Sequence, residues 1–186
     1  MEYLLIALVS YVLGSIPFGF ILTKIFLKKD IRNIGSGNIG ATNALRTGNK
    51  ALGYTTLALD IAKAVIPVLF VKFNYPEYVF IASLCAFLGH VFPVWLKFKG
   101  GKGVATYVGI LFSINIILGF VFVVSWGIIF VISKFSSLSF FNTSIVLLIP
   151  PIVSSSFPRI EPDLSIIATT SWLIGDIFYI IIFNIW

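Results

Sequence analysis

The chain alternates between long apolar runs and short polar segments. A helix needs about 20 apolar residues to cross the hydrocarbon core of a membrane. The pattern therefore predicts helical spans at about residues 4–26, 52–71, 79–96, 104–118, 119–132, 140–153 and 164–186. The predicted fold class is all-α: a polytopic membrane protein of about seven transmembrane helices that form a single integral membrane domain over residues 1–186.

The fourth and fifth predicted spans are short because they share one uncharged stretch, residues 104–133. Its length of about thirty residues is too great for one ordinary span and too small for two full ones. If the flanking Lys102 and Lys134 are both cytoplasmic, the chain crosses the membrane an even number of times here. We therefore expect two short helices that turn near Ser113–Asn115 or at Gly119. A single long tilted helix is the alternative.

The composition fits a membrane protein and excludes several other classes. Of the 186 residues, 59% are hydrophobic and 11% are charged, and the mean hydropathy is +1.05. Soluble domains are about 45–50% apolar and about 25% charged, and the figures also exclude disordered, collagen-like and disulfide-rich secreted chains. Cys85 is the single cysteine, so no internal disulfide is expected. The first residues, Met1-Glu2-Tyr3, show no basic region or small-residue cleavage site, so we expect the first apolar run to be retained as a span.

The net charge of +6 is unevenly distributed along the chain. Most basic residues fall in three short segments, at about residues 24–50, 97–102 and 134, whereas the other polar connections carry a slight negative excess. Cytoplasmic loops of membrane proteins collect Lys and Arg, which predicts an external N-terminus, an internal C-terminus and basic segments in the cytoplasm. Nucleic acid is not an expected partner, because the basic residues lie in short loops without an aromatic stacking surface.

The first basic segment contains a glycine-rich stretch from Asp30 to Arg46, with the sequence DIRNIGSGNIGATNALR. Glycines permit positive φ, so successive backbone N–H groups can converge on an anion. The side-chain donors and cations that accompany them are Arg32, Ser36, Asn38, Thr42, Asn43 and Arg46. We interpret the stretch as an anion cradle that leads into a helix. A flexible polar turn between two spans is the alternative.

A second glycine-rich stretch, Gly100-Gly101-Lys102-Gly103, precedes an apolar run and again places N–H groups and a cation at a helix start. Lys102 is the candidate ligand, while Lys97 and Lys99 suit contacts with anionic lipid headgroups. His90 is the only histidine. It is either a general base or a packed structural residue.

Two opposite charges lie inside an apolar run. Asp60 and Lys63 are three residues apart and so share a helix face. Intramembrane charges are costly and usually face a partner or an aqueous cavity, so the two form either a structural ion pair or part of the wall of the site. The sequence shows no cluster of metal ligands and no nucleophile elbow of a Ser-His-Asp hydrolase, so we expect neither.

Together these motifs resemble the bacterial acyl-phosphate:glycerol-3-phosphate acyltransferases. The resemblance extends over about residues 1–139 and is carried by Gly14–Gly19, Asp30–Arg32, Gly35–Asn38, Gly40–Asn43, Gly89-His90, Pro93, Phe98, Gly100–Thr106 and Lys134–Leu138. It implies a seven-helix enzyme of the bacterial cytoplasmic (inner) membrane with its active site facing the cytoplasm. The implied reaction moves an acyl chain from acyl phosphate to the 1-hydroxyl of sn-glycerol 3-phosphate, and makes lysophosphatidate for phospholipid biosynthesis without a cofactor.

The resemblance also implies roles for individual residues. Acyl phosphate is expected to bind at Ser36, Gly37, Asn38, Gly40 and Asn43, and glycerol 3-phosphate at Arg46, Lys102 and Ser137. Ser36 and His90 are the candidates for a catalytic role, but neither is a convincing base, and the leaving phosphate is the expected proton acceptor. Membrane lipid is an expected partner, and partner enzymes of phospholipid synthesis are compatible with this function.

The chain departs from the family's pattern after about residue 139. Family members usually end with a basic motif built around Arg-His, and that motif is missing here because His90 is the only histidine. An inactive acyltransferase-like membrane protein is therefore one alternative. The other is a transporter of anions or phosphorylated metabolites, because glycine-broken helices also build transporter sites.

Overall fold

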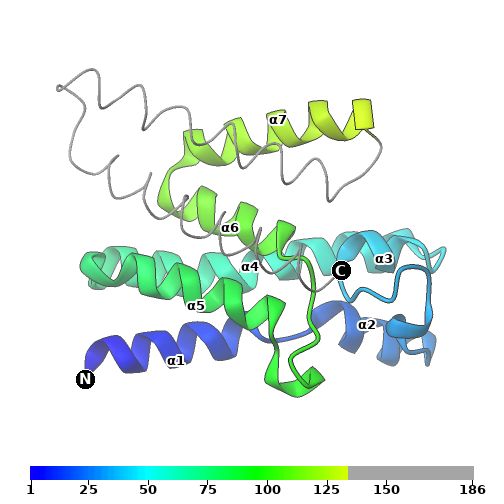
Figure 1. Cartoon of the computed structure of the whole chain (residues 1–186), viewed down its shortest axis with the longest axis horizontal. Helices are drawn as coiled ribbons and strands as arrows, with labels where there is room; N and C mark the ends of the chain where they lie inside the picture. Colours follow the sequence, from blue (N-terminus) through cyan, green and yellow to red (C-terminus); the bar gives the residue numbers. More distant parts are fainter. Residues whose placement is uncertain (134–186) are drawn as a thin grey trace. The chain divides into compact units, whose positions relative to one another are not determined.

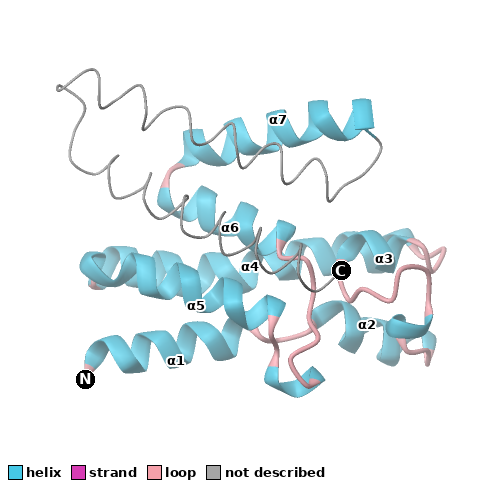
Figure 2. Cartoon of the chain, viewed as in Figure 1, coloured by secondary structure: helices cyan, strands magenta, loops and turns pink. Residues whose placement is uncertain are grey.

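A computed structural model describes residues 1–133 of the chain (Figure 1). The described elements are α1 (Glu2–Gly14), α2 (Phe18–Leu27), η1 (Ile31–Asn33), α3 (Ala41–Leu45), α4 (Lys50–Asn74), η2 (Pro76–Tyr78), α5 (Val79–Val91), η3 (Val94–Leu96), α6 (Val104–Ile114) and α7 (Ile116–Ser133), where η denotes a 3-10 turn. All regular structure within these residues is helical (Figure 2), which confirms the all-α expectation for this part of the chain. The predicted spans at 140–153 and 164–186, the third basic segment and Ser137 lie outside the described residues.

The chain divides into two compact units, Met1–Ile114 and Asn115–Trp186, and each is described by itself. Helices α1 to α6 belong to the first unit, and α7 belongs to the second. Both glycine-rich segments therefore lie within the first unit.

The first apolar run folds as two helices. α1 ends at Gly14 and α2 begins at Phe18, although the apolar composition continues through the break. Pro17 lacks the N–H group that a continuous helix would use, and the Ser15 hydroxyl donates to the Val12 carbonyl at 2.8 Å. The run that the sequence places at 4–26 is thus divided at residues 15–17.

The longest described helix, α4, is central to the first unit (Figure 1). Its 25 residues reach about 37 Å, at a rise of about 1.5 Å per residue, and it contacts α1, α2, α3, α5 and α6. Asn49 caps its N-terminus by accepting a hydrogen bond from the Leu52 N–H at 3.1 Å. The N-terminal end of α4 is therefore anchored beside the first glycine-rich segment, which α3 joins to it.

Glycines allow α1 and α5 to approach closely. Gly14 lies against the backbone of Ala86, and Gly89 lies against the backbone of Tyr11, so that a Cβ atom at either glycine would collide with the facing main chain. Small residues at helix contacts are typical of membrane proteins, where packing rather than apolar burial holds the helices together.

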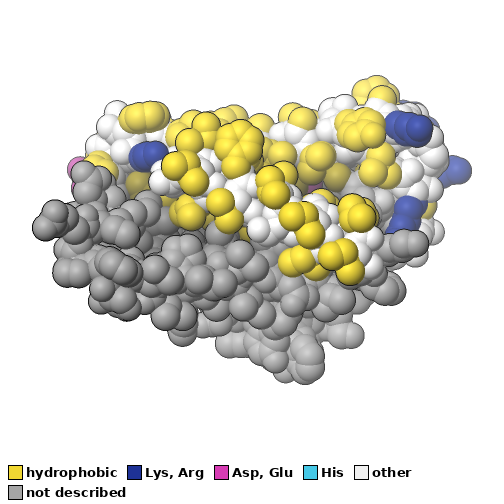
Figure 3. Space-filling model, turned by 90° about the horizontal axis from the view of Figure 1, so that it is seen from above, with side chains coloured by type: hydrophobic (Ala, Val, Ile, Leu, Met, Phe, Trp, Pro, Cys, Tyr) yellow, Lys and Arg dark blue, Asp and Glu magenta, His cyan; other side chains and the backbone are white. Residues whose placement is uncertain are grey.

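Two segments within residues 1–133, Glu2–Leu27 and Pro76–Leu96, are long and apolar enough to cross a membrane. Val104–Ile114 and Ile116–Ile132 are shorter apolar helices. Large apolar side chains are exposed on the surface, for example Leu5 at 64% and Phe73 at 78%. Figure 3 shows apolar side chains spread over the described part of one face, with several basic side chains gathered near one end. Such a surface suits a lipid environment.

The uncharged stretch of residues 104–133 is broken at Asn115, between α6 and α7. The Asn115 side-chain oxygen accepts hydrogen bonds from the N–H groups of Ile117 and Leu118 at 2.8 and 3.3 Å, which is the geometry of an N-terminal cap. The break lies in the first of the two places where the sequence allows a turn. Two crossings of the membrane by these helices remain a prediction.

Candidate functional site

Asn43 organises the first glycine-rich segment from within. Its side chain is 1% exposed, and its amide nitrogen donates to the carbonyls of Ile31, Ile34 and Asn38 at 3.1, 2.9 and 2.7 Å. Its amide oxygen accepts a hydrogen bond from the Ser36 N–H at 3.0 Å. A single side chain on α3 therefore fixes the loop of residues 31–38.

Two glycines complete the shape of this loop. Gly35 and Gly37 have φ angles of +55° and +72°, a region that favours glycine. A Cβ atom on Gly35 would also lie 2.5 Å from the Asn43 amide oxygen and 2.9 Å from Cδ of Arg46. Position 35 therefore requires glycine for its conformation and for the space around it, and the Arg46 side chain passes beside the loop.

The residues expected to bind acyl phosphate differ in accessibility. Ser36 is exposed, and Gly37, Asn38 and Gly40 are partly exposed. The Asn38 side-chain oxygen accepts a hydrogen bond from the Gly40 N–H at 2.9 Å. Asn43 is buried, and its amide bonds to the loop backbone. The structure therefore places the first four at the surface of the loop and Asn43 beneath them.

Arg32 is paired within its own turn. Its Nε and Nη2 atoms bond to the Asp30 carboxylate oxygens at 3.0 and 2.6 Å, and its guanidinium lies 5.0 Å from the centre of the Phe20 ring. The side-chain hydrogen bond from Arg32 lowers the pKa of Asp30 to about 2, and the same bond raises the pKa of Arg32. Of the two arginines expected to grip an anion, Arg32 is therefore engaged by a carboxylate, whereas Arg46 lies beside the loop.

The second glycine-rich segment folds back onto the end of α5. The N–H groups of Gly100 and Gly101 donate to the carbonyls of Val91 and His90 at 3.0 and 3.1 Å. These carbonyls lie in the last turn of α5, where a helix leaves its acceptors without intrahelical partners. Lys102 follows directly and is half-buried.

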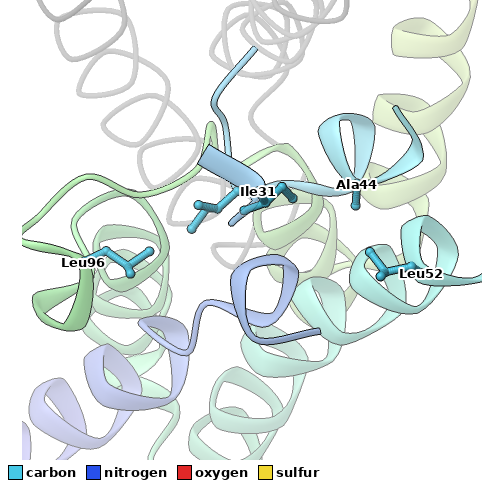
Figure 4. Packing of buried hydrophobic residues seen from close by; sticks show 5 residues of the cluster. Ile31, Ala44, Leu52 and Leu96 are labelled. Atoms are coloured by element: carbon cyan, nitrogen blue, oxygen red, sulfur yellow. The ribbon is translucent and has the colours of Figure 1, made fainter. Parts of the chain in front are cut away.

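A shared apolar cluster brings the two glycine-rich segments together. Ile31, Ile39 and Ala44 of the first segment pack with Leu52 of α4 and Leu96 of η3 (Figure 4). None of the five is more than 6% exposed. Because Leu96 shortly precedes the second glycine-rich segment, the cluster fixes the two segments beside each other.

Cationic side chains of the two segments also interact. Burial lowers the pKa of Lys102, and repulsion from Arg46 lowers that pKa further. A pair of like charges on neighbouring loops suits a phosphate group, whose oxygens accept charge-assisted hydrogen bonds. The structure thus brings together Arg46 and Lys102, two of the three residues expected to bind glycerol 3-phosphate, while Ser137 lies outside the described residues.

Asp60, Lys63 and His90 form a buried polar group behind the second segment, and none is more than 4% exposed. Nζ of Lys63 lies 2.8 Å from Oδ1 of Asp60 and donates to the Ile16 carbonyl at 2.8 Å. Nδ1 of His90 lies 3.8 Å from the same Asp60 oxygen. The ion pair therefore also stabilises the break between α1 and α2. Within residues 1–133, no three His, Cys, Asp or Glu residues form a group suited to a metal ion.

Two aromatic side chains outside the glycine-rich stretches tie the residues that precede the second segment to the first apolar run. The Tyr11 hydroxyl donates to the Phe92 carbonyl at 2.7 Å, and the Trp95 indole N–H donates to the Ser15 hydroxyl at 2.8 Å. Neither contact is predicted from the sequence, because the partners are 81 and 80 residues apart. The sequence indicates only that Tyr and Trp carry a polar atom, which usually forms a hydrogen bond when it is buried.

Comparison with known proteins identifies a family. The sequence matches the family model described as glycerol-3-phosphate acyltransferase over residues 4–185. The glycerol-3-phosphate acyltransferase of Pelagibacter ubique is 83% identical over 139 residues, which are 75% of this chain and 73% of that protein. That of Bartonella henselae is 49% identical over 160 residues, covering 83% of this chain and 74% of that protein. The family model thus extends beyond residue 139, where the motif resemblance ends.

The fold is similar to that of PlsY, whose crystal structures are described as an integral membrane glycerol 3-phosphate acyltransferase. The glycerol 3-phosphate form gives a TM-score of 0.84 at 30% identity, and the match covers 96% of this chain and 87% of that chain. The lysophosphatidic acid form gives a TM-score of 0.82 with the same coverage. Both likenesses support an integral membrane fold.

Proposed function

This chain belongs to the glycerol-3-phosphate acyltransferase family, and we propose that it transfers an acyl chain from acyl phosphate to the 1-hydroxyl of sn-glycerol 3-phosphate. The products are lysophosphatidate, which enters phospholipid synthesis, and inorganic phosphate. The observation that carries the proposal is the convergence of the two glycine-rich segments, with Arg46 close enough to lower the pKa of Lys102.

Together the two segments are suited to two anionic substrates. The accessible surface of the first, with Ser36, Gly37, Asn38 and Gly40, would hold the phosphate of the acyl donor. Arg46 and Lys102 would hold the phosphate of glycerol 3-phosphate by charge-assisted hydrogen bonds, with Ser137 as the third proposed ligand. The shared apolar cluster then sets the distance between donor and acceptor.

The chemistry requires positioning more than a protein nucleophile. Acyl phosphate is a mixed anhydride, so the 1-hydroxyl oxygen attacks its carbonyl carbon, the C–O bond to phosphate breaks, and the phosphate leaves with the electron pair. We assign the hydroxyl proton to the leaving phosphate, because His90 is buried beneath the second segment and a serine hydroxyl such as that of Ser36 is not a base at neutral pH. Oriented substrates and fixed cations then lower the barrier.

The proposed setting is the bacterial inner membrane, with seven spans and an active site that faces the cytoplasm. The support is the placement of Lys24, Lys28 and Lys29 beside the first segment and of Lys97 and Lys99 beside the second. Basic loops favour the cytoplasmic side, and glycerol 3-phosphate is a charged solute that would reach the site from that side.

The test is turnover by the purified protein. Supplied with acyl phosphate and glycerol 3-phosphate, the wild type should form lysophosphatidate, and Lys102→Ala should lower kcat/KM by about 10–100-fold, because a hydrogen bond to a charged group contributes about 1.5–3 kcal/mol. Lys99→Ala, just before the same segment, is the matched control and should stay near wild type.

A parallel uptake measurement with protein in liposomes separates the alternatives. Uptake of glycerol 3-phosphate without formation of lysophosphatidate would show that the protein is a transporter and not an enzyme. Neither uptake nor product would indicate an inactive member of the family, consistent with the absent Arg-His motif.

A further inference from the structure

The main chain at Gly101 is held from two sides by His90. The Gly101 N–H donates to the His90 carbonyl at 3.1 Å. A Cβ atom at Gly101 would collide with Nε2 of the His90 ring and would lie 2.8 and 3.1 Å from Cε1 and Cδ2. The ring therefore lies directly beneath the residue that precedes Lys102.

The His90 ring is in turn confined by side chains of α4. Its Nδ1 faces Oδ1 of Asp60 on α4 at 3.8 Å, and that carboxylate is paired with Lys63 at 2.8 Å. The ring is 3% exposed. An imidazole with one edge toward a fixed carboxylate and the other against Gly101 has little freedom to move, so the position of α4 is transmitted to the second glycine-rich segment.

We propose that His90 is a positioning residue for Lys102: its ring supports Gly101 and so sets where the Lys102 ammonium meets the phosphate of glycerol 3-phosphate. The inference rests on the proposed binding of that substrate by Lys102. It gives His90 a role through contact with the loop rather than through proton transfer, and it explains why glycine is required at position 101.

A double-mutant cycle between positions 90 and 101 tests the contact. Gly101→Ala should raise the KM for glycerol 3-phosphate about tenfold because the new methyl group meets the ring. His90→Ala should also raise it about tenfold because the segment loses its support. If the two changes were independent, the double variant would show about a hundredfold rise. We expect it to stay near tenfold, because the methyl group added at position 101 fills part of the space left by the ring.

Two measurements distinguish a positioning role of His90 from a general disruption of the fold. In His90→Ala, the KM for acyl phosphate should stay within about twofold of wild type while the KM for glycerol 3-phosphate rises. Cys85→Ala, on the same helix but away from the loop, should change neither. If His90→Ala does not fold, His90→Asn vacates the Nε2 position while keeping an amide toward Asp60, and it replaces alanine in the same cycle.

Multiplicative effects of the two substitutions, or parallel rises in both KM values, would overturn the inference while leaving the proposed function intact. A wild type that makes no lysophosphatidate would instead reject the proposed function. In that case the same four variants are compared by their Kd for glycerol 3-phosphate instead of by KM. A wild type that does not bind this ligand overturns the inference as well.

Discussion

At the scale of single residues, the first glycine-rich segment depends on the amide of Asn43. Three carbonyls converge on its nitrogen, and one N–H bonds to its oxygen. A carboxylate of the same shape would satisfy the N–H but would place a negative oxygen against the carbonyls. The chemical identity of this side chain, more than its size, therefore decides the shape of the loop.

We accordingly expect Asn43→Asp to lower kcat/KM for acyl phosphate by at least about a hundredfold. Each buried carbonyl left without a donor costs about 1–3 kcal/mol, and a hundredfold loss corresponds to about 2.7 kcal/mol. Steady-state kinetics measures the effect. Asn33→Asp, the same change at an exposed position of the same segment, is the control, and equal losses in the two variants would contradict the role given to Asn43.

The ionisation of Lys102 gives a prediction about pH. Its lowered pKa, caused first by burial and then by Arg46, favours the neutral amine. As pH rises, the ammonium is lost earlier than in an ordinary lysine, so the KM for glycerol 3-phosphate should begin to rise below the usual lysine range. Lys102→Arg should be less active, because the two cations differ in shape, but it should retain its charge and shift the rise to higher pH. If the KM of Lys102→Arg for glycerol 3-phosphate rises at the same pH as that of the wild type, a group other than Lys102 titrates.

The sequence predicts which residue types gather at the site but not how each is used. Glycines, amides and cations at positions 35–46 and 100–103 indicate an anion site, because glycines let backbone N–H groups converge and the side chains add donors and positive charge. The burial of Asn43 and the pairing of Arg32 with Asp30 depend on the folded path of the loop. Neither could be derived from residue type and spacing.

At the scale of elements, the main difference from the sequence-based prediction is that the first apolar run is divided into two helices. Continuous apolar composition predicts one helix over 4–26, and only Pro17 signals a stop. The break is sustained by Lys63, which donates to the Ile16 carbonyl from 47 positions along the chain. The sequence identifies Asp60 and Lys63 as neighbours on one face of a helix, but their link to α1 and α2 arises only from packing.

Lys63→Met should therefore destabilise the protein by about 3–5 kcal/mol, the usual cost of leaving one buried charge of a pair without its partner. The measurement is the free energy of unfolding in detergent. Adding Asp60→Asn should recover part of the loss, because it removes the unpaired charge. Lys72→Met is the matched control: Lys72 donates to the Ser113 and Ile114 carbonyls at 3.0 and 2.8 Å, and its removal leaves no buried carboxylate. An equal loss in Lys72→Met would argue against the ion pair as the cause.

At the scale of the whole molecule, family membership indicates the fold, whereas local geometry indicates which residues the site depends on. A TM-score of 0.84 at 30% identity shows that the fold persists while most side chains change. The 83% identity to the Pelagibacter ubique relative applies over 139 residues, a length that matches the stretch in which the family motifs are found. The site should therefore depend on the loops of the first unit and their apolar cluster, whereas a lipid-facing helix surface needs only to remain apolar.

The charge distribution predicts an orientation for the molecule in the membrane, which can be tested with one reactive group at a time. Cys85 is the single cysteine, so Cys85→Ala provides a background without thiols. Into it we would introduce Lys28→Cys, at the end of α2, or Glu77→Cys, in η2. Because cytoplasmic loops collect basic residues, a membrane-impermeant maleimide added to intact cells should label position 77 and not position 28. Inverted vesicles should give the opposite result. Labelling of position 28 from outside intact cells would place the glycine-rich segments on the external face, and with them the proposed site.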